Sequence, residues 1–574
     1  MRHLEARPSE DQFTPESASL SGTRAGAPDN SPLPKGAEPA SAAASLRSRL
    51  SPTGRIFLLI SLVAGALTHG YHLFQYPLYI TDEGIYMQQA WSLLREGQLS
   101  PYTYFYDHSP AGWIMITGWV SVLPWQFQTF GNAINTGRVL MLLVHIVSIY
   151  LLFQVTYRFS KSVLAAFIAT FFFNFSPLAI YYQRQVLLDN LMVFWMLLCL
   201  YLITRDDRSI KTLVLSGLTF GIAVITKENA IFFAPVLIYM LYTQVRAWEN
   251  YRFALGFWAF TACSVISLYF LYATLKNELL PSHFNFNLNA PPADHVSLLY
   301  TIWWQIHRSQ GSILDIHSYY WVIFNIWLMR DRFILLFGGL AILINCLIGF
   351  SDRKLHRSYL IVGLLGMSYA FYIVRGSELL EFYIVPLIPF LAMNLGMLTS
   401  HMLGKLQQNS DKVIPLFTQV VVTFSLFAVL LSPIGGYFFV RDEYGKVVPH
   451  DLYKLSVTYM ETEQLAFIRQ HIPSDDKVII DDELWVDLHD VAPYYKWAHS
   501  HFKAASDPDV RDKLFAKNWQ NIDYIVMSNK MLEAMQLNNG GGSEDYILEA
   551  LQHSQRIWDL KRGDIELQIY QVEK

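Results

Sequence analysis

Long apolar runs recur between residues 56 and 439 and decide what this chain can fold into. About eleven of them approach the roughly 17–25 residues that an α-helix needs to cross the core of a bilayer. The composition agrees, because 53% of the 574 residues are hydrophobic and only 16% are charged, unlike an ordinary soluble domain. We therefore predict an all-α polytopic membrane protein. The runs are Ile56–Phe74, Val139–Tyr157, Val163–Ile180, Leu187–Ile203, Leu213–Ile225, Ala230–Val245, Phe253–Leu275, Phe333–Phe350, Tyr359–Val374, Phe382–Leu398 and Ile414–Phe439.

The lysines and arginines between these runs predict the orientation in the membrane. They gather in alternate loops, and short loops rich in Lys and Arg remain on the cytoplasmic side. This pattern places the N-terminus in the cytoplasm and the intervening loops, which carry most of the acids, outside. Eleven spans also place the C-terminus outside. The basic loops contain Arg158 and Lys161; Arg205, Arg208 and Lys211; Arg246 and Arg252; Arg353, Lys354 and Arg357; and Lys405 and Lys412.

Changes in composition divide the chain into three parts. Residues 1–50 are rich in Ala, Ser, Pro and Gly without an apolar period, which predicts a disordered cytoplasmic tail. Residues 51–440 would form the transmembrane domain, with residues 456–574 as a small extracytoplasmic α/β domain. In that last part Glu461–His471 has helical periodicity, and the sequences KVIID, DYIVM and IELQIYQV are typical of strands. We interpret the acidic stretch Asp481–Glu483 as a solvated strand end.

The first outer loop, Thr81–Gly112, concentrates ionisable residues between two spans. An acid facing lipid costs about 2.5–3.5 kcal/mol even on insertion scales, so such a loop is expected to have a function. Ile85–Leu94 carries apolar residues at helical spacing, and Trp113–Trp125 is apolar but too short to span. Both segments predict helices lying in the membrane interface.

Asp82 and Glu83 open this loop and allow two interpretations. Thr81 or Asp82 could be the N-cap of the helix, accepting hydrogen bonds from its first N–H groups. Alternatively, a carboxylate here could be a general base that takes a proton from an acceptor hydroxyl. The two roles are compatible.

Further charged residues lie in loops predicted on the same outer side: Asp107 and His108, Arg184 and Asp189, Lys227 and Glu228, and Arg375. Acids beside cations suit an anionic, phosphate-bearing substrate. Several of them also have a structural explanation. Asp189 begins a span, where a helix N-terminus favours a carboxylate. Lys227 and Glu228 could be a local ion pair at a span boundary, and a lone Asp-His pair is often structural.

The order of these motifs resembles a known family. DEG-x-Y-x-x-x-A follows the first span, then come YDH-x-P-x-G, a span after Arg138, SP-x6-RQ-x-LLDN and a G-x-A-x-x-TK turn. This order resembles the membrane glycosyltransferases of the protein O-mannosyltransferase and lipid A aminoarabinose transferase kind, over most of residues 55–400. The resemblance implies a GT-C fold and a polyprenyl-phosphate sugar as donor. It also implies transfer on the extracytoplasmic side to a protein, lipid or glycan acceptor, by direct displacement.

The resemblance also implies roles, position by position. Asp82 matches the catalytic acid and is the expected base, Glu83 would support it, and Asp189 matches the acid of the LLDN motif. Asp107, His108, Arg184, Lys227, Glu228 and Arg375 would bind substrate, the cations near the donor phosphate. No cofactor is implied; cationic side chains could replace a divalent metal, which is possible but not required. One residue departs from the family, which usually has proline where this chain has Ser109, so the backbone at His108 is less restricted.

A transporter or flippase of lipid-linked sugars is the alternative, because it would also need many spans with polar groups at their ends. Against it, no inverted repeat is visible in the sequence, and the charges gather at one face instead of the midplane. A third possibility is a membrane anchor for a C-terminal binding module, for which eleven spans are more than needed. The net charge of −4 without a basic motif argues against nucleic acid as a partner.

Overall fold

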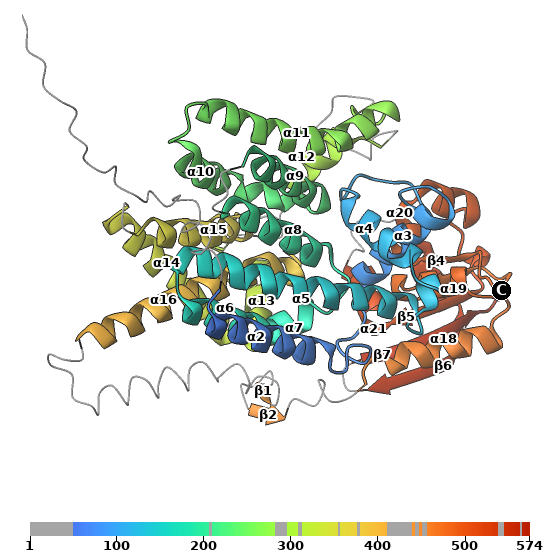
Figure 1. The fold of residues 1–574 in the computed structure, drawn as a ribbon. Helices are drawn as coiled ribbons and strands as arrows, with labels where there is room; N and C mark the ends of the chain where they lie inside the picture. The colour runs from blue at the N-terminus through green and yellow to red at the C-terminus, as the bar shows by residue number, and fades with distance from the viewer. Residues whose placement is uncertain are drawn as a thin grey trace, which may run out of the picture. The chain divides into compact units, whose positions relative to one another are not determined.

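The computed structural model in Figure 1 describes residues 50–205, 209–281, 296–307, 311, 313–353, 356–375, 379–409, 439–441, 447–449, 456–537, 545–562 and 565–574. Most of the described chain before residue 410 is helical. Its α-helices are α2 (Pro52–Gly70), α3 (Thr81–Arg95), α4 (Ala111–Ser121), α5 (Ala133–Ser160), α6 (Val163–Phe175), α7 (Pro177–Tyr182), α8 (Leu188–Ile203), α9 (Ile210–Thr226), α10 (Ala234–Val245), α11 (Tyr251–Leu275), α12 (Leu298–His307), α13 (Tyr319–Arg330), α14 (Arg332–Ser351), α15 (Arg357–Val374) and α16 (Ile388–Asn409).

Six of the described helices are long and apolar enough to cross a membrane: α2, α5, α11, α14, α15 and the segment Glu381–Lys405. Three shorter apolar helices, α6, α8 and α9, accompany them. The chain is therefore an integral membrane protein, as predicted. The first ten predicted runs are all helical at least in part. The eleventh lies outside the described residues, except for its last residue, Phe439, which begins the short strand β1 (Phe439–Arg441).

Three predicted runs, 163–180, 230–245 and 382–398, prove to be composite, and proline accounts for the break in the first. The run 163–180 is interrupted at Ser176, because the residue before Pro177 is disfavoured in the α conformation. The hydroxyl of Ser176 instead accepts a hydrogen bond from Ala179 N and caps α7. The run 382–398 begins as a 3-10 helix, η3 (Glu381–Leu387), which contains Pro386 and leads into α16. A second 3-10 segment, η2 (Glu228–Phe233), connects α9 to α10.

Buried polar pairs connect the apolar helices. Asn345 of α14 donates a hydrogen bond of 2.9 Å to the side-chain oxygen of Asn394 of α16, and the Asn394 amide donates to the carbonyl of Val362 in α15. Ser61 of α2 and Thr170 of α6 are 2.8 Å apart. Amide and hydroxyl side chains of this kind stabilise contacts between helices in a membrane.

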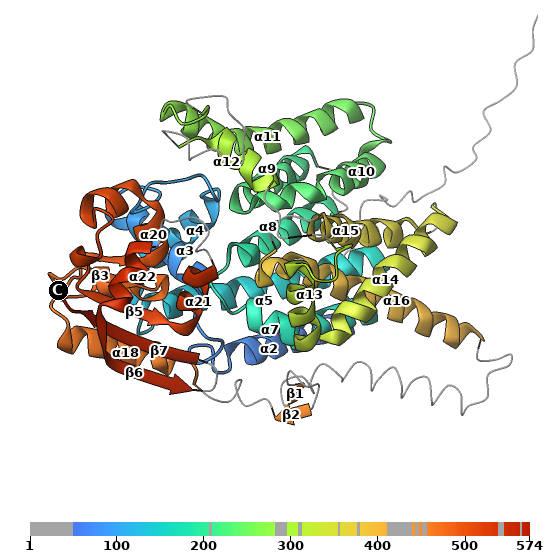
Figure 2. The same ribbon diagram turned by 180° about the vertical axis from the view of Figure 1, so that it is seen from behind.

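The C-terminal part combines a small sheet with helices, in agreement with the α/β character that the sequence predicts. Its five-stranded sheet has the order β4-β3-β5-β7-β6, in which β3 is parallel to β4 and β5, and β7 is antiparallel to β5 and β6. Figure 2 labels β3, β5, β7 and β6, and Figure 1 labels β4. The elements are α18 (Tyr459–His471), β3 (Val478–Ile480), the 3-10 turn η4 (Asp482–Leu484), α19 (Trp485–Asp490), β4 (Ala498–Ser500), α20 (His501–Ser506), β5 (Tyr524–Ser528), α21 (Asn529–Leu537), α22 (Asp545–Gln552), β6 (Ser554–Arg562) and β7 (Ile565–Val572).

Candidate active site

Asp82 lies in the first turn of α3, one of the two helices predicted for the interface. The N-cap is Ile80, which makes no side-chain cap hydrogen bond, so the capping explanation for Thr81 and Asp82 is wrong. Instead, the Asp82 carboxylate accepts a hydrogen bond of 3.0 Å from the hydroxyl of Tyr86, one turn later. The other groups around Asp82 belong to elements that are distant from α3 in the sequence.

Glu83, the next residue, points into the protein and is fully buried. Arg138 of α5 binds both of its carboxylate oxygens, at 2.8 Å through Nε and 2.6 Å through Nη2. The backbone N–H of Val186 donates a third hydrogen bond at 2.9 Å. Arg138 also donates to the carbonyl of Pro77, before α3. Because Arg138 already occupies both oxygens, Glu83 fits a supporting role that fixes the start of α3.

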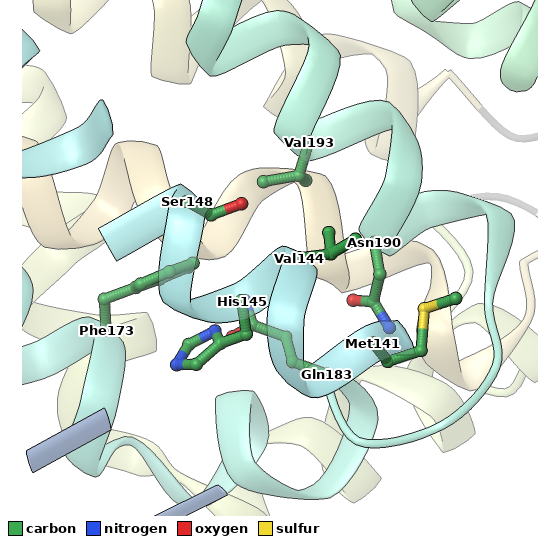
Figure 3. Close-up of a pocket in the computed structure, with 8 residues that line it drawn as sticks. All are labelled: Met141, Val144, His145, Ser148, Phe173, Gln183, Asn190 and Val193. Carbon is green, nitrogen blue, oxygen red and sulfur yellow. The ribbon is translucent and has the colours of Figure 1, made fainter. Parts of the chain in front are cut away.

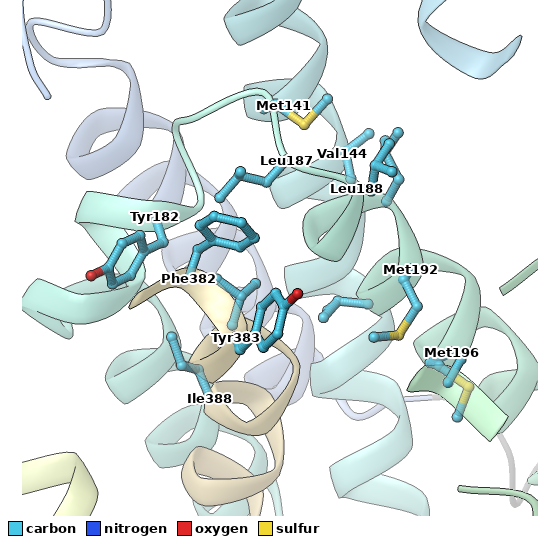
Figure 4. Close-up of a cluster of buried hydrophobic side chains, with 14 of the residues drawn as sticks. Met141, Val144, Tyr182, Leu187, Leu188, Met192, Met196, Phe382, Tyr383 and Ile388 are labelled. Carbon is cyan, nitrogen blue, oxygen red and sulfur yellow. The ribbon is translucent and has the colours of Figure 1, made fainter. Parts of the chain in front are cut away.

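Asp189 and Lys227 form a second buried ion pair, at the N-terminal turn of α8 and directly after α9. The Lys227 ammonium lies 2.9 Å from one Asp189 oxygen. It also lies 5.1 Å and 5.0 Å from the ring centres of Phe382 and Tyr383, close enough for cation–π attraction. These two rings project from η3 beside Leu187 (Figure 4). The buried cation is thus enclosed by a carboxylate and two aromatic faces.

The electrostatics of Asp82 connect it to this pair. Part of Asp82 reaches the surface, but burial of its carboxyl away from water raises the pKa of that group to about 6. The Lys227 ammonium and the Tyr86 hydroxyl oppose this shift, whereas the carboxylates of Asp189 and Asp482 add to it. A carboxyl with a pKa near neutrality is suited to accept a proton in a reaction.

The YDHS loop reaches the same place from the other side. The ring of His108 lies edge-on to the ring of Tyr86, with 6.0 Å between their centres. The backbone carbonyl of His108 accepts hydrogen bonds from the hydroxyls of Tyr104 and Tyr269, and that of Asp107 accepts one from Gln305 at 3.2 Å. These contacts fix the loop through its backbone.

Ser109, where the family usually has proline, makes a contact that proline could not make. Its backbone N–H donates to the Glu228 carboxylate at 2.5 Å, and proline has no N–H. Glu228 therefore holds the loop beside His108, which is a positioning contact and differs from the predicted contact with substrate.

Replacing Ser109 with proline should therefore destabilise the protein, although proline is the usual residue in the family. Losing a buried hydrogen-bond partner costs about 1–3 kcal/mol. Ser109→Ala is the matched control, because it removes the hydroxyl but keeps the N–H. Thermal unfolding of the purified variants should give a lower melting temperature for Ser109→Pro than for Ser109→Ala. Equal melting temperatures would contradict this role of Glu228.

The two predicted arginines contact elements other than α3. The guanidinium of Arg184 is buried and donates to the carbonyl of Thr68, near the end of α2, and to that of Tyr76, in the segment that follows α2. Arg375 is exposed at the end of α15 and lies 5.1 Å from the ring centre of Tyr372. Tyr372 is in turn 6.3 Å from Tyr383, so Arg375 borders the aromatic surroundings of Lys227.

Two further charged groups are not singled out by the sequence. Arg138 only precedes a predicted span there, and no local pattern signals that its partner is Glu83. Arg330, at the end of α13, pairs with Glu381 at 3.1 Å and stacks 3.5 Å from the ring centre of Tyr181. Because Glu381 directly precedes Phe382, this pair borders the same aromatic segment. In the sequence, the high density of aromatic residues around Arg330 is the feature that could have indicated this site.

A small internal cavity lies between the helices, and two of its lining residues, Gln183 and Asn190, adjoin Arg184 and Asp189 in the sequence (Figure 3). None of the predicted site residues lines it, and we assign it no catalytic role. The described residues also contain no group of three or more His, Cys, Asp or Glu side chains arranged to hold a metal ion. The cavity is lined by Met141, Val144, His145, Ser148, Phe173, Gln183, Asn190 and Val193.

Comparisons with known proteins agree with the predicted resemblance. Residues 122–272 match the model of the dolichyl-phosphate-mannose-protein mannosyltransferase family. No curated protein matches this chain significantly by sequence. Among solved structures, ArnT from Cupriavidus metallidurans bound to undecaprenyl phosphate is similar, with 15% identity, a TM-score of 0.55 and coverage of 91% of this chain and 98% of ArnT.

The archaeal oligosaccharyltransferase AglB from Archaeoglobus fulgidus, in complex with an inhibitory peptide and a dolichol-phosphate, is also similar. Its identity is 12% and its TM-score 0.54, with coverage of 88% of this chain and 73% of AglB. The predicted resemblance is confirmed: this chain has the fold of the GT-C glycosyltransferases that use polyprenyl-phosphate sugars, and its residues 122–272 match their protein mannosyltransferase family.

Proposed function

We propose that this chain is a glycosyltransferase that moves a sugar from a polyprenyl-phosphate carrier to an extracytoplasmic acceptor. The observation that supports it best is the proximity of Asp82, whose pKa is raised to about 6, to the buried cation Lys227. One group can accept the proton of a nucleophile, and the other can stabilise the charge of a departing phosphate.

The proposed reaction is a direct displacement at the anomeric carbon. The acceptor hydroxyl oxygen attacks that carbon while Asp82 takes the hydroxyl proton. The bond between the carbon and the phosphate oxygen breaks, and the polyprenyl phosphate leaves with the electron pair. Because the new bond forms opposite the leaving group, the anomeric configuration inverts.

The remaining residues divide between the donor and the scaffold. Lys227 would contact the donor phosphate while Asp189 holds the ammonium in place. Arg375 would offer a second cation at the edge of the same aromatic surroundings. Asp107 and His108 would border the acceptor, since their loop adjoins Tyr86 next to Asp82. Glu83 and Glu228 are positioning residues in this scheme, and Arg184 is assigned no contact with the phosphate.

The carrier and the location are part of the proposal. ArnT has been solved with undecaprenyl phosphate and AglB with dolichol-phosphate, which supports a long prenyl phosphate as the carrier here. The alternation of Lys and Arg in the loops supports an extracytoplasmic active site and C-terminal domain. The number of long apolar runs in the sequence supports about eleven spans within residues 51–440.

The pKa of Asp82 predicts a specific dependence of activity on pH. A base acts only when deprotonated, so kcat/KM should reach a plateau above about pH 6 and fall about tenfold per pH unit below it. Because the Tyr86 hydroxyl lowers the pKa of Asp82, Tyr86→Phe should move this fall to higher pH. Transfer rates of the wild type and of Tyr86→Phe, measured from about pH 4.5 to 8, would check the position of the fall and its displacement. A midpoint near 4, the ordinary value for Asp, would contradict the assignment of the base.

The proposal itself is tested by incubating the purified full-length chain in detergent with mannosyl and aminoarabinosyl derivatives of undecaprenyl phosphate and dolichyl phosphate. Mass spectrometry would follow the release of polyprenyl phosphate, with and without a chelator to establish metal dependence. Release that requires an added acceptor supports a transferase. Transport of the lipid-linked sugar across sealed vesicles, without cleavage, would support the flippase alternative.

A further inference from the structure

The C-terminal domain contacts the helix that carries Asp82. Its turn η4 packs on α3, where Gly84 lies against the backbone of Asp482 and Glu483. A Cβ atom added to Gly84 would overlap the backbone carbonyl of Asp482 and would lie 2.6 Å from Glu483 N. Glycine is therefore required for this close approach. The contact occurs two residues beyond Asp82.

Hydrogen bonds extend this contact along α3. One turn after Gly84, the amide of Gln88 donates to the carboxylate of Asp482 at 2.7 Å. The hydroxyl of Ser500, in β4, donates to the other carboxylate oxygen at 2.9 Å. Asp482 is only 1% exposed. A carboxylate bound from both sides in this way joins α3 to the sheet of the C-terminal domain.

Further contacts secure the same helix and the loop that follows it. The indole N–H of Trp91 and the guanidinium of Arg95 both donate to Asp490, at 2.8 Å and 2.9 Å. Tyr102 lies 3.0 Å from His499 and accepts a hydrogen bond of 2.8 Å from Trp485. The domain thus contacts most of the length of α3.

Asp482 also belongs to the set of charges that face Asp82. Tyr86 faces Asp82 from the same helix, Lys227 from the end of α9, Asp189 from α8 and Asp482 from η4. Asp482 is the member of this set that the C-terminal domain supplies. Its negative charge raises the pKa of Asp82, which gives the domain an electrostatic as well as a steric influence on the proposed base.

We propose that the C-terminal domain positions the catalytic helix, with Asp482 and Gln88 as positioning residues and Gly84 as the position that permits their contact. The proposal rests on the proposed function, because it concerns the orientation and charge of Asp82. It assigns to the extracytoplasmic domain a part in the chemistry, in place of a separate binding module.

Gly84→Ala in the full-length protein tests the steric part. The added methyl group should displace η4 from α3, so amide hydrogen exchange in α3 should become at least about tenfold faster. The transfer rate kcat should fall about tenfold to 100-fold with KM within about threefold, because a small misplacement of a reacting group is costly. The matched control is Gly118→Ala in α4, where an added Cβ meets nothing within 4 Å.

Asp482→Asn tests the electrostatic part, because asparagine keeps the shape and can still bond to Gln88 and Ser500. The fall of kcat/KM on the acid side should move to lower pH, since the carboxylate that raises the pKa of Asp82 is neutralised. A purely structural role would leave this midpoint in place. Gln88→Met removes the hydrogen-bond donor to Asp482 but keeps helix propensity. It should accelerate amide hydrogen exchange in α3, and it should move the midpoint of the acid-side fall in kcat/KM less than Asp482→Asn does.

The outcomes separate this inference from the proposed function. If the wild-type protein transfers no sugar, the proposed function fails. Independently of that result, unchanged amide hydrogen exchange in α3 of Gly84→Ala would overturn the proposed packing of η4 on α3. If the wild type is active but Gly84→Ala matches Gly118→Ala in exchange and kcat, the positioning role is wrong. If exchange changes while the acid midpoint of Asp482→Asn stays at the wild-type value, the electrostatic role is wrong. A variant that does not fold would be recognised by its elution profile in size-exclusion chromatography. If Gly84→Ala does not fold, Gln88→Met tests the contact between η4 and α3 in its place.

Discussion

Asp82→Asn is expected to lower the rate of sugar transfer by about 10²–10⁴-fold, the usual contribution of a general base. Asparagine has nearly the same shape and can still accept a hydrogen bond from Tyr86, so α3 should keep its place. It cannot accept the proton of the acceptor hydroxyl. Binding of the donor lipid should change little, because the Asp189–Lys227 pair is intact. Initial rates and KM for the polyprenyl-phosphate sugar, measured side by side, would show this separation.

The control for this variant is Asp475→Asn, which removes an exposed carboxylate after α18 and should leave the rate unchanged. The pH profile adds a second criterion: residual activity of Asp82→Asn should no longer fall around pH 6, where the wild-type base titrates. A rate within a few fold of the wild type would exclude Asp82 as the base.

Glu83→Gln is expected to reduce the stability of the whole protein by about 3–5 kcal/mol, because it leaves the charge of Arg138 buried without its counter-ion. Both side chains of this pair are fully inaccessible to solvent. Arg138 also donates to the carbonyls of Leu73, Pro77 and Leu78, in the segment between α2 and α3. Loss of the pair should therefore loosen that segment, and thermal unfolding in detergent should show a clearly lower melting temperature.

A double variant distinguishes the buried charge from a change of shape. Glu83→Gln combined with Arg138→Met removes both charges, so it should be more stable than Glu83→Gln alone. Lys513→Met is the control for an exposed ion pair, since Lys513 and Asp509 are both mostly solvent-accessible, and its melting temperature should be unchanged. A double variant that is less stable than either single variant would contradict the account of a buried charge.

Hydrophobic periodicity predicts much of the fold, for a physical reason. A helix in a membrane must be apolar over its whole length, and this signal predicts the helices α2, α8, α9, α11, α14 and α15 to within a few residues, whereas α5 begins six residues before the predicted run. The amphipathic helix α3 and the strands β3, β5 and β7 were also predicted. Strand β6 was missed because its sequence, SQRIWDLKR, lies at the edge of the sheet and is largely polar.

The candidate site was predictable as a set of residues, but their pairing was not. Position in the predicted outer loops indicates that Asp82, His108, Asp189 and Lys227 belong together, and the structure brings them close. The partner of Glu83 lies 55 residues away in the sequence, and that of Ser109 lies 119 residues away. Only tertiary packing determines such pairs. For the same reason no local signal showed that Arg184 faces α2.

The acidic stretch in the C-terminal domain shows the same limit. Asp481–Glu483 is interpreted from sequence as a solvated strand end, which is wrong for Asp482, a buried residue bonded to Gln88 and Ser500. Three consecutive acids are usually solvated, and their sequence carries no sign of the helix that covers them. A contact between segments almost 400 residues apart becomes visible only in the structure.

The central claim, that Asp82 and Lys227 belong to a sugar-transfer site, is tested most directly by one measurement. Purified wild-type protein is incubated with undecaprenyl-phosphate and dolichyl-phosphate sugars at about pH 7, above the midpoint expected for Asp82. We expect acceptor-dependent release of the polyprenyl phosphate, with inversion at the anomeric carbon of the product. Intact donor in every incubation, with no product formed, would contradict the account.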